Sequence, residues 1–162
     1  MATAGKGLSD YDLESLPNGA HCKVGIAVSE WNRPITEGML EGAMEVLQAS
    51  GVSRDSVIVN WVPGSFELPL AAQWMTAKPE IDGVICIGSV IRGETAHFDY
   101  VCEATAHGIM RVNLDSNKPV MFCVLTDNNK EQAEARSGGK YGNKGVEAAV
   151  GLLKMLANRQ NI

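Results

Sequence analysis

Several features that mark other classes of protein are missing from this chain of 162 residues. It has no block of lysine and arginine, its formal net charge is −5, and only 6% of its residues are aromatic, which argues against a nucleic-acid-binding surface. No apolar run is long enough to span a membrane. The three histidines lack the spacing of metal ligands, so no metal site is predicted.

The cysteines also lack a pattern, because no two of them form a C-x-x-C pair. Three lie in predicted strands and one on the apolar face of a predicted helix, which is typical of buried, reduced thiols in the cytoplasm: Cys22, Cys86, Cys102 and Cys123. The first twenty residues are acidic and lack the apolar centre of a signal peptide. We therefore expect a flexible N-terminal arm over 1–20 and a single domain over 21–162.

Apolar runs alternate with amphipathic stretches along the rest of the chain. Strands are expected at 22–29, 56–62, 83–91 and 120–125. Helices are expected at 34–50, 66–78, 98–112, 128–136 and 143–158. Repeated strand–helix–strand units with short connections favour one α/β sandwich of three layers, with a central four-stranded parallel sheet and helices on both faces.

The junction that follows the third predicted strand is the most informative segment. The apolar run 83–91 leads directly into 92–97, at the head of an amphipathic helix. Such a junction offers unpaired backbone N–H groups and the positive end of a helix dipole to an anion. His97 brings an imidazole, which titrates near neutral pH, within one helical turn of that anion. The segment predicts a phosphate site beside a proton-handling group at the carboxyl edge of the sheet.

Five motifs follow one another along the chain: WNRPIT at 31–36, WVPGSFELP at 61–69, GSVIRGETAHFDYV at 88–101, FCVLT at 122–126 and QAEARSGGKYGNKG at 132–145. In this order they resemble the 6,7-dimethyl-8-ribityllumazine synthase family, which acts at the penultimate step of riboflavin biosynthesis. The resemblance covers about residues 20–158. It implies a flavodoxin-like sheet and a cofactor-free condensation of 5-amino-6-(D-ribitylamino)uracil with 3,4-dihydroxy-2-butanone 4-phosphate, with release of phosphate and water.

The same resemblance implies a homo-oligomer in which neighbouring subunits of a pentamer share active sites. The short connection 137–140 is similar to that of members whose pentamers pack into an icosahedral shell, a 60-mer. Such a shell leaves room for a riboflavin synthase as a partner.

Roles for individual residues follow from the matching positions. The resemblance implies that His97 assists proton transfer. It implies contacts with the pyrimidine and its ribityl chain by Trp31, Asn32, Ser65, Phe66, Glu67, Ser89, Val90, Ile91 and, from the neighbouring subunit, Phe122. It implies that the phosphate is held by Gly93, Glu94, Thr95, Arg136 and Lys140.

Structural interpretations of these residues stand beside the functional ones. Ser65 could cap a helix, Arg136 could complement a helix dipole, and Phe122 could belong to the core. For the whole chain, the alternative function is a flavin-binding or shell-forming relative that has lost turnover. His97, Arg136 and Glu67 together favour the enzyme, since a passive shell needs none of them.

Overall fold

A computed structural model describes residues 11–162 of the chain. In these residues, four parallel strands form one sheet in the order β2-β1-β3-β4. The strands are β1 (Val24–Ser29), β2 (Val57–Val62), β3 (Gly83–Ile91) and β4 (Val120–Asp127). The predicted four-stranded parallel sheet is confirmed.

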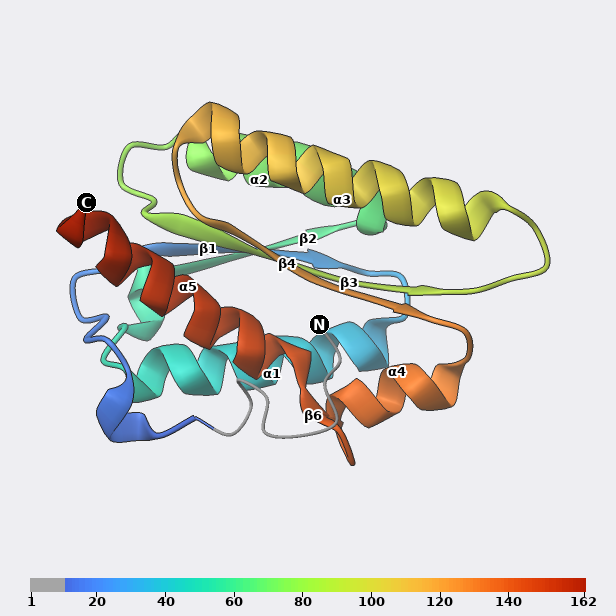
Figure 1. Ribbon diagram of the computed structural model, residues 1–162, viewed down its shortest axis with the longest axis horizontal. Helices are drawn as coiled ribbons and strands as arrows, with labels where there is room; N and C mark the ends of the chain where they lie inside the picture. The colour runs from blue at the N-terminus through green and yellow to red at the C-terminus, as the bar shows by residue number, and fades with distance from the viewer. Residues whose placement is uncertain (1–10) are drawn as a thin grey trace.

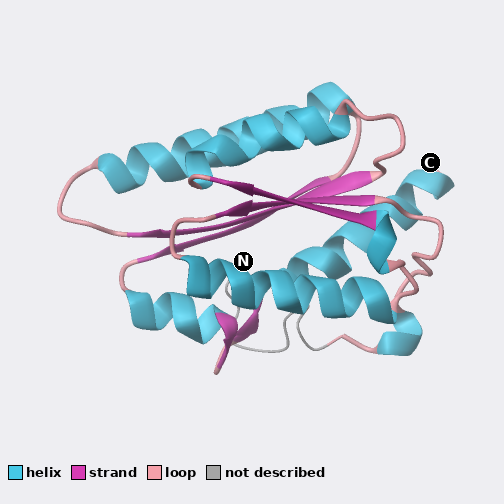
Figure 2. Cartoon of the chain, turned by 180° about the vertical axis from the view of Figure 1, so that it is seen from behind, coloured by secondary structure: helices cyan, strands magenta, loops and turns pink. Residues whose placement is uncertain are grey.

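Helices cover both faces of this sheet and complete the predicted three layers (Figure 1, Figure 2). On one face lie α2 (Leu68–Thr76) and α3 (His97–Ser116). On the other face lie α1 (Arg33–Ala49), α4 (Lys130–Arg136) and α5 (Lys144–Asn161). With right-handed crossovers, a helix changes face when the chain reverses its direction along the sheet. The chain moves one way from β1 to β2 and the other way from β2 through β3 to β4, so α1 lies on one face and α2 and α3 lie on the other.

The central position of β3 explains its continuous apolar sequence. It pairs with β1 on one side and with β4 on the other, so its two faces are both covered. Ile85 and Ile87 belong to the core cluster beneath α1 and α5, whereas Val84 and Cys86 belong to the cluster beneath α2 and α3. Hydrophobic burial on both faces makes this strand the rigid support of the residues that follow it.

Capping residues set several of the helix boundaries. Gly51 adopts a φ of 96° after α1, as expected for a residue that ends a helix in the left-handed region. Asn143 caps α5, because its Oδ1 accepts a hydrogen bond from the backbone N–H of Gly145 at 2.8 Å. The predicted N-cap role of Asn143 is confirmed.

Three local features differ from the sequence-based expectation. A 3-10 turn, η3 (Ser65–Glu67), precedes α2. Strand β4 continues two residues beyond its predicted end at 125. A small antiparallel hairpin of β5 (Ser137–Gly139) and β6 (Gly142–Asn143) occupies a segment predicted to have no strand. Its strands are too short and glycine-rich to give an alternating pattern, and Gly138 has a φ of 114°.

The N-terminal arm predicted over 1–20 falls partly on residues 1–10, which lie outside the described residues. In residues 11–20, a 3-10 turn, η1 (Leu13–Ser15), is followed by a contact with the end of α1. The backbone N–H of Gly19 donates to the carbonyl oxygen of Ser50 at 2.8 Å. Tyr11 and Leu16 pack against the core cluster beneath α1 and α5.

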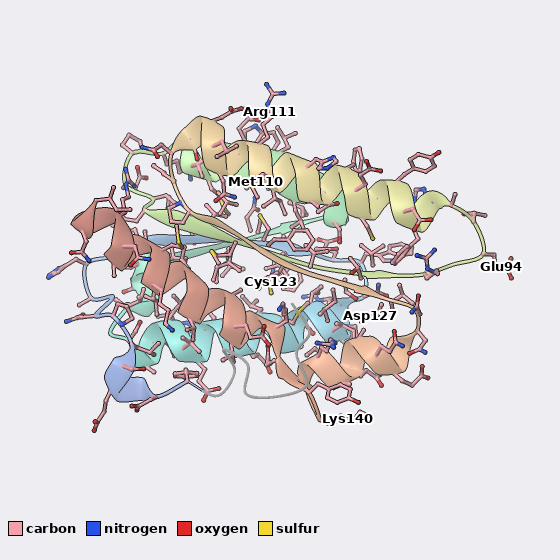
Figure 3. The ribbon with its side chains drawn as sticks, in the orientation of Figure 1. Glu94, Met110, Arg111, Cys123, Asp127 and Lys140 are labelled. Carbon is pink, nitrogen blue, oxygen red and sulfur yellow. The ribbon has the colours of Figure 1, made fainter. Side chains whose placement is uncertain are left out.

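The outward side of α2 and α3 exposes large apolar side chains. Trp74 on α2 is 62% exposed and Leu114 on α3 is 74% exposed. Leu70, Tyr100 and Met110 extend the same surface, and Figure 3 shows Met110 and Arg111 on α3. We call these five apolar residues the α2–α3 surface. Apolar exposure on this scale marks an interaction surface.

Candidate active site

A cavity of about 660 Å³ opens where β1, β2 and β3 reach their carboxyl ends. We call it the main cavity. It gathers most of the predicted site residues from three segments that are distant in sequence: Trp31, Ser65, Phe66, Glu67, Ser89, Val90, Ile91, Gly93, Thr95 and His97. A ligand in an open parallel sheet is expected at this edge.

Asn32 fixes the position of Trp31 relative to β3. It adopts a left-handed conformation with a φ of 57°, which asparagine tolerates better than most residues. Its Nδ2 donates to the carbonyl oxygen of Ser89 at 2.9 Å. Asn32 thus ties the end of β1 to the end of β3, while the indole of Trp31 remains 72% exposed and free to stack on a flat ring.

Two buried hydroxyl groups in the wall of the main cavity have no hydrogen-bond partner, Ser65 Oγ and Ser89 Oγ. Ser65 packs directly on Gly88, where a Cβ atom would lie 2.5 Å from Ser65 Oγ. Gly64 occupies the N-cap position of η3, so the proposed capping role of Ser65 is wrong. Both oxygens are closed off from the cavity surface, so among residues 11–162 they remain buried polar groups without a partner, which are uncommon in native structures.

The turn between β3 and α3 presents backbone and imidazole to the same cavity. Nothing lies within 4 Å of the position that a Cβ atom on Gly93 would take, so the backbone there is open to close approach. Thr95 Oγ1 accepts a hydrogen bond from the backbone N–H of His97 at 3.4 Å. Glu94 does not line the cavity, and its side chain extends away from the body of the molecule (Figure 3).

Arg92 holds this turn in place, a role that the sequence did not suggest. Its guanidinium pairs with Asp99 at 2.9 Å and lies over the ring of Phe98, 4.1 Å from the ring centre. Its Nε donates to Asn128 Oδ1 at 3.2 Å, beyond the end of β4. Arg92 therefore joins the first turn of α3 to the loop before α4.

A second cavity, of about 500 Å³, lies between the end of β4, α4 and the β5–β6 hairpin. We call it the cationic cavity, because Arg136 and Lys140 both line it. The two side chains approach the ring of Tyr141, Arg136 Cζ at 5.7 Å and Lys140 Nζ at 4.7 Å from its centre. Cation–π contacts of this kind hold both charges beside the cavity.

Asp127 lines the cationic cavity as well and was not singled out from the sequence. It is only 8% exposed, and its Oδ2 has no hydrogen-bond partner. Burial raises the pKa of Asp127, and the positive charge of Arg136 offsets part of that rise. The predicted strand ends at 125 and the next predicted helix begins at 128, so the sequence gives no reason to expect Asp127 to be buried.

One chain does not bring all the predicted site residues together. Arg136 and Lys140 line the cationic cavity, and Phe122, 40% exposed on β4, lines neither cavity. The described lining of the main cavity contains no lysine or arginine. The predicted site residues therefore lie in two separate cavities of the chain, with Phe122 outside both.

Two further features of residues 11–162 concern metal binding and membrane insertion. Within this range no group of three or more His, Cys, Asp or Glu side chains is placed to hold a metal ion. None of the described helices combines the length and apolar character that crossing a membrane requires.

Burial raises the pKa of Cys123 to about 12 and raises that of Cys86 as well, which makes these thiols inert.

Comparison with known proteins connects this site to a family. The family model described as 6,7-dimethyl-8-ribityllumazine synthase matches residues 21–160. The chain is 53% identical over 155 residues to the 6,7-dimethyl-8-ribityllumazine synthase of Porphyromonas gingivalis, covering 96% of each protein. It is 55% identical over 157 residues to that of Cytophaga hutchinsonii, covering 97% of this chain and 98% of the relative.

The chain belongs to the 6,7-dimethyl-8-ribityllumazine synthase family. The 6,7-dimethyl-8-ribityllumazine synthase of Pediococcus pentosaceus is 45% identical over 145 residues, covering 90% of this chain and 93% of the relative. The predicted family is therefore confirmed. The chain is an enzyme of riboflavin biosynthesis with lumazine synthase activity.

Proposed function

We propose that the chain condenses 5-amino-6-(D-ribitylamino)uracil with 3,4-dihydroxy-2-butanone 4-phosphate, forms 6,7-dimethyl-8-ribityllumazine, and releases phosphate and water. The observation that carries this proposal is the composition of the main cavity. It combines the exposed indole of Trp31, the carboxylate of Glu67, the open turn at Gly93 and the imidazole of His97. The indole suits a flat heterocycle, the carboxylate suits the hydroxyls of a polyol chain, the glycine turn suits a phosphate, and the imidazole suits a proton transfer.

Each substrate group has a place in this arrangement. The pyrimidine stacks on Trp31, and its polar edge meets the backbone at the end of β3, from Ser89 to Ile91. The ribityl hydroxyls bind near Ser65 and Glu67. The phosphate sits on the turn that contains Gly93 and Thr95, at the N-terminus of α3.

His97 lies one turn from that phosphate and relays protons as the substrate amine adds to the ketone. Because the aligned substrates supply much of the rate enhancement, His97→Ala should reduce kcat by about 10²-fold, the low end for a proton-transfer residue.

A neighbouring copy completes the site. The main cavity has no cation of its own for the phosphate, whereas Arg136 and Lys140 stand in a different cavity of the same chain. If the copies pack so that the cationic cavity of one faces the main cavity of the next, the guanidinium of Arg136 forms a bidentate ion pair with the phosphate. The ring of Phe122 then covers the heterocycle. This pairing is heterologous, so repetition around an axis closes a ring, and the proposed ring is a pentamer.

The α2–α3 surface supports assembly, because the exposed side chains of Trp74 and Leu114 need a cover. We further propose that the pentamers form a 60-mer shell, with a riboflavin synthase as a partner that uses the product. The proposed location is the cytoplasm, which the four free cysteines support.

Mixed assemblies test whether the site is shared. Chains carrying His97→Ala and chains carrying Arg136→Ala are refolded together in equal amounts, and lumazine formation is followed by absorbance. Random mixing gives roughly one quarter of interfaces with both half-sites intact, so activity should rise toward a quarter of wild type. Activity equal to the average of the two separate variants would refute a shared site.

Substrate dependence tests the role of Arg136 by itself. Arg136→Ala should raise the KM for the phosphorylated ketone by about tenfold or more, with a much smaller change for the pyrimidine. An equal change in both constants would contradict the assignment. Bound flavin without any product would instead favour the alternative, a shell-forming relative that has lost turnover.

A further inference from the structure

The turn between β3 and α3 receives little support from the core. Every residue from Arg92 to His97 is exposed, and the next buried side chain is that of Phe98. Within residues 11–162, the backbone N–H groups of 93–96 find no hydrogen-bond acceptor. Successive backbone N–H groups of this kind can receive an anion, provided that something else fixes the shape of the turn.

The side chain of Arg92 spans the turn and joins its two ends. Nη2 of Arg92 donates to Oδ1 of Asp99 at 2.9 Å, and Nη1 donates to Oδ2 at 3.5 Å. The backbone N–H of Arg92 donates to the carbonyl oxygen of Asp127 at 2.9 Å, which anchors the first end to the sheet. The backbone N–H of Asp99 donates to the carbonyl oxygen of Ala96 at 3.0 Å, in the first turn of α3. The pair therefore closes the loop 93–98 at its base and limits its conformations.

The remaining contacts of the guanidinium also lie within the chain. Nε of Arg92 donates to Oδ1 of Asn128 at 3.2 Å, and Cζ lies over the ring of Phe98, 4.1 Å from its centre. Phe98 lines the main cavity, whereas Arg92 does not. Arg92 therefore acts on the main cavity through the ring of Phe98 and the shape of the turn.

We propose that Arg92 is a positioning residue for phosphate binding, because its pairing with Asp99 holds the backbone donors of 93–96 in the arrangement that receives the phosphate. This inference rests on the proposed function, in which the phosphate sits on this turn. Without the pair, the phosphate must order the turn as it binds, and this loss of conformational freedom weakens binding. Lysine cannot replace Arg92, since a single ammonium group does not pair with a carboxylate through two nitrogens while it reaches Asn128.

Asp99→Ala in the assembled full-length protein separates this role from two simpler ones. The KM for the phosphorylated ketone should rise about threefold or more, as expected for the loss of a partly exposed charge pair. The KM for the pyrimidine and kcat should stay within about twofold of the wild type. If Arg92 bound the phosphate directly, Asp99→Ala would free its guanidinium and lower the KM for the ketone. Removal of a negative charge near the phosphate would lower it as well, so an unchanged or lower KM overturns the proposal.

Glu37→Ala is the matched control. Arg33 pairs with Glu37 at 2.8 Å and lies over the ring of Trp61, 4.8 Å from its centre, but this pair lies within one helix and encloses no turn. Glu37→Ala should leave both KM values unchanged, and a rise equal to that of Asp99→Ala overturns the proposal. Arg92→Lys should raise the KM for the ketone about threefold or more, like Asp99→Ala, and a wild-type value in this variant overturns the proposal too.

Titration calorimetry with inorganic phosphate repeats the comparison without turnover. Asp99→Ala should weaken phosphate binding about threefold or more, and Glu37→Ala should not change it. If the wild type and variants follow this pattern but the wild type forms no lumazine from the two substrates, the proposed function fails and the role of Arg92 stands. If the wild type forms lumazine and Asp99→Ala keeps the wild-type KM and phosphate affinity, the role of Arg92 fails by itself.

Discussion

Replacing Gly145 by alanine should separate α5 from α1. A Cβ atom at this position would overlap the carbonyl oxygen of Met39 and lie 2.7 Å from its carbonyl carbon. The obstacle is the backbone of a helix whose Met39 side chain is fully buried, so no side-chain rotation removes it. To reach ordinary van der Waals contact with that oxygen, the start of α5 must move by about 1.5 Å or more.

The expected loss of stability follows from two opposing terms. Overpacking a core costs about 1–3 kcal/mol, and a blocked backbone puts this site at the upper end. Alanine in place of glycine returns about 1 kcal/mol through its better helix propensity. The net loss is about 2 kcal/mol, which lowers the Tm of a chain of this length by roughly 4–8 °C. Circular dichroism melting at matched protein concentrations measures it, because assembly makes Tm concentration-dependent.

Gly151, on the same helix, provides the control. A Cβ atom there would lie 2.7 Å from Met121 Cε, the end of a flexible side chain that can move aside. Gly151→Ala should therefore melt within about 2 °C of the wild type. A Gly145→Ala variant as stable as the wild type would refute the steric argument. So would a Gly151→Ala variant that loses as much stability as Gly145→Ala.

Four further outcomes are expected. Lys118→Met should lower the Tm by several degrees, because Lys118 Nζ donates to two backbone carbonyls at the end of α2 at 2.9 and 2.8 Å. Cys86 and Cys123 should react with a thiol reagent at pH 8 only after unfolding, since burial raises the pKa of both thiols. Gly93→Ala should fold normally but raise the KM for the phosphorylated ketone, because a Cβ atom there would take space needed by the phosphate. Burial raises the pKa of Asp127 above its ordinary value of 3.8, so its stabilising contribution is complete at lower pH and is lost as the pH rises through the folded-state pKa. The difference between the Tm of Asp127→Asn and the Tm of the wild type should therefore shift in favour of the variant as the pH increases.

Each of these outcomes has a clear opposite. A Lys118→Met variant with an unchanged Tm would show that water replaces the ammonium group without loss. Rapid labelling of four thiols in the native protein would contradict the burial of Cys86 and Cys123. An unchanged KM in Gly93→Ala would place the phosphate elsewhere. A Tm difference for Asp127→Asn that does not vary with pH would show that Asp127 keeps one protonation state.

The sheet was predictable because its strongest signal is local. The apolar run of β3 needs cover on both faces, and the alternation of strands with amphipathic helices leaves few other arrangements. The main cavity was predictable for a related reason. In a parallel sheet all carboxyl ends meet at one edge, so Trp31, Ser65 and His97 had to lie near one another.

What could not be predicted depends on contacts between distant segments. The β5–β6 hairpin has too few residues to show an alternating pattern and is held in place by the glycines of α1 that face it. The burial of Asp127 depends on how α4 folds back over the end of β4. His97 and Arg136 line two different cavities, and this separation is a property of tertiary structure that the order of motifs along the chain does not contain.

The outward side of α2 and α3 also constrains how this protein is made. A newly made chain exposes Trp74 and Leu114 to water. In the proposed assembly a second copy covers them, and before that happens they can drive aggregation with other newly made chains. Slow synthesis keeps the concentration of newly made chains low, so the proposed assembly takes longer. Very fast synthesis raises that concentration and favours aggregation. Yield in a heterologous host should therefore pass through an optimum as the expression rate increases.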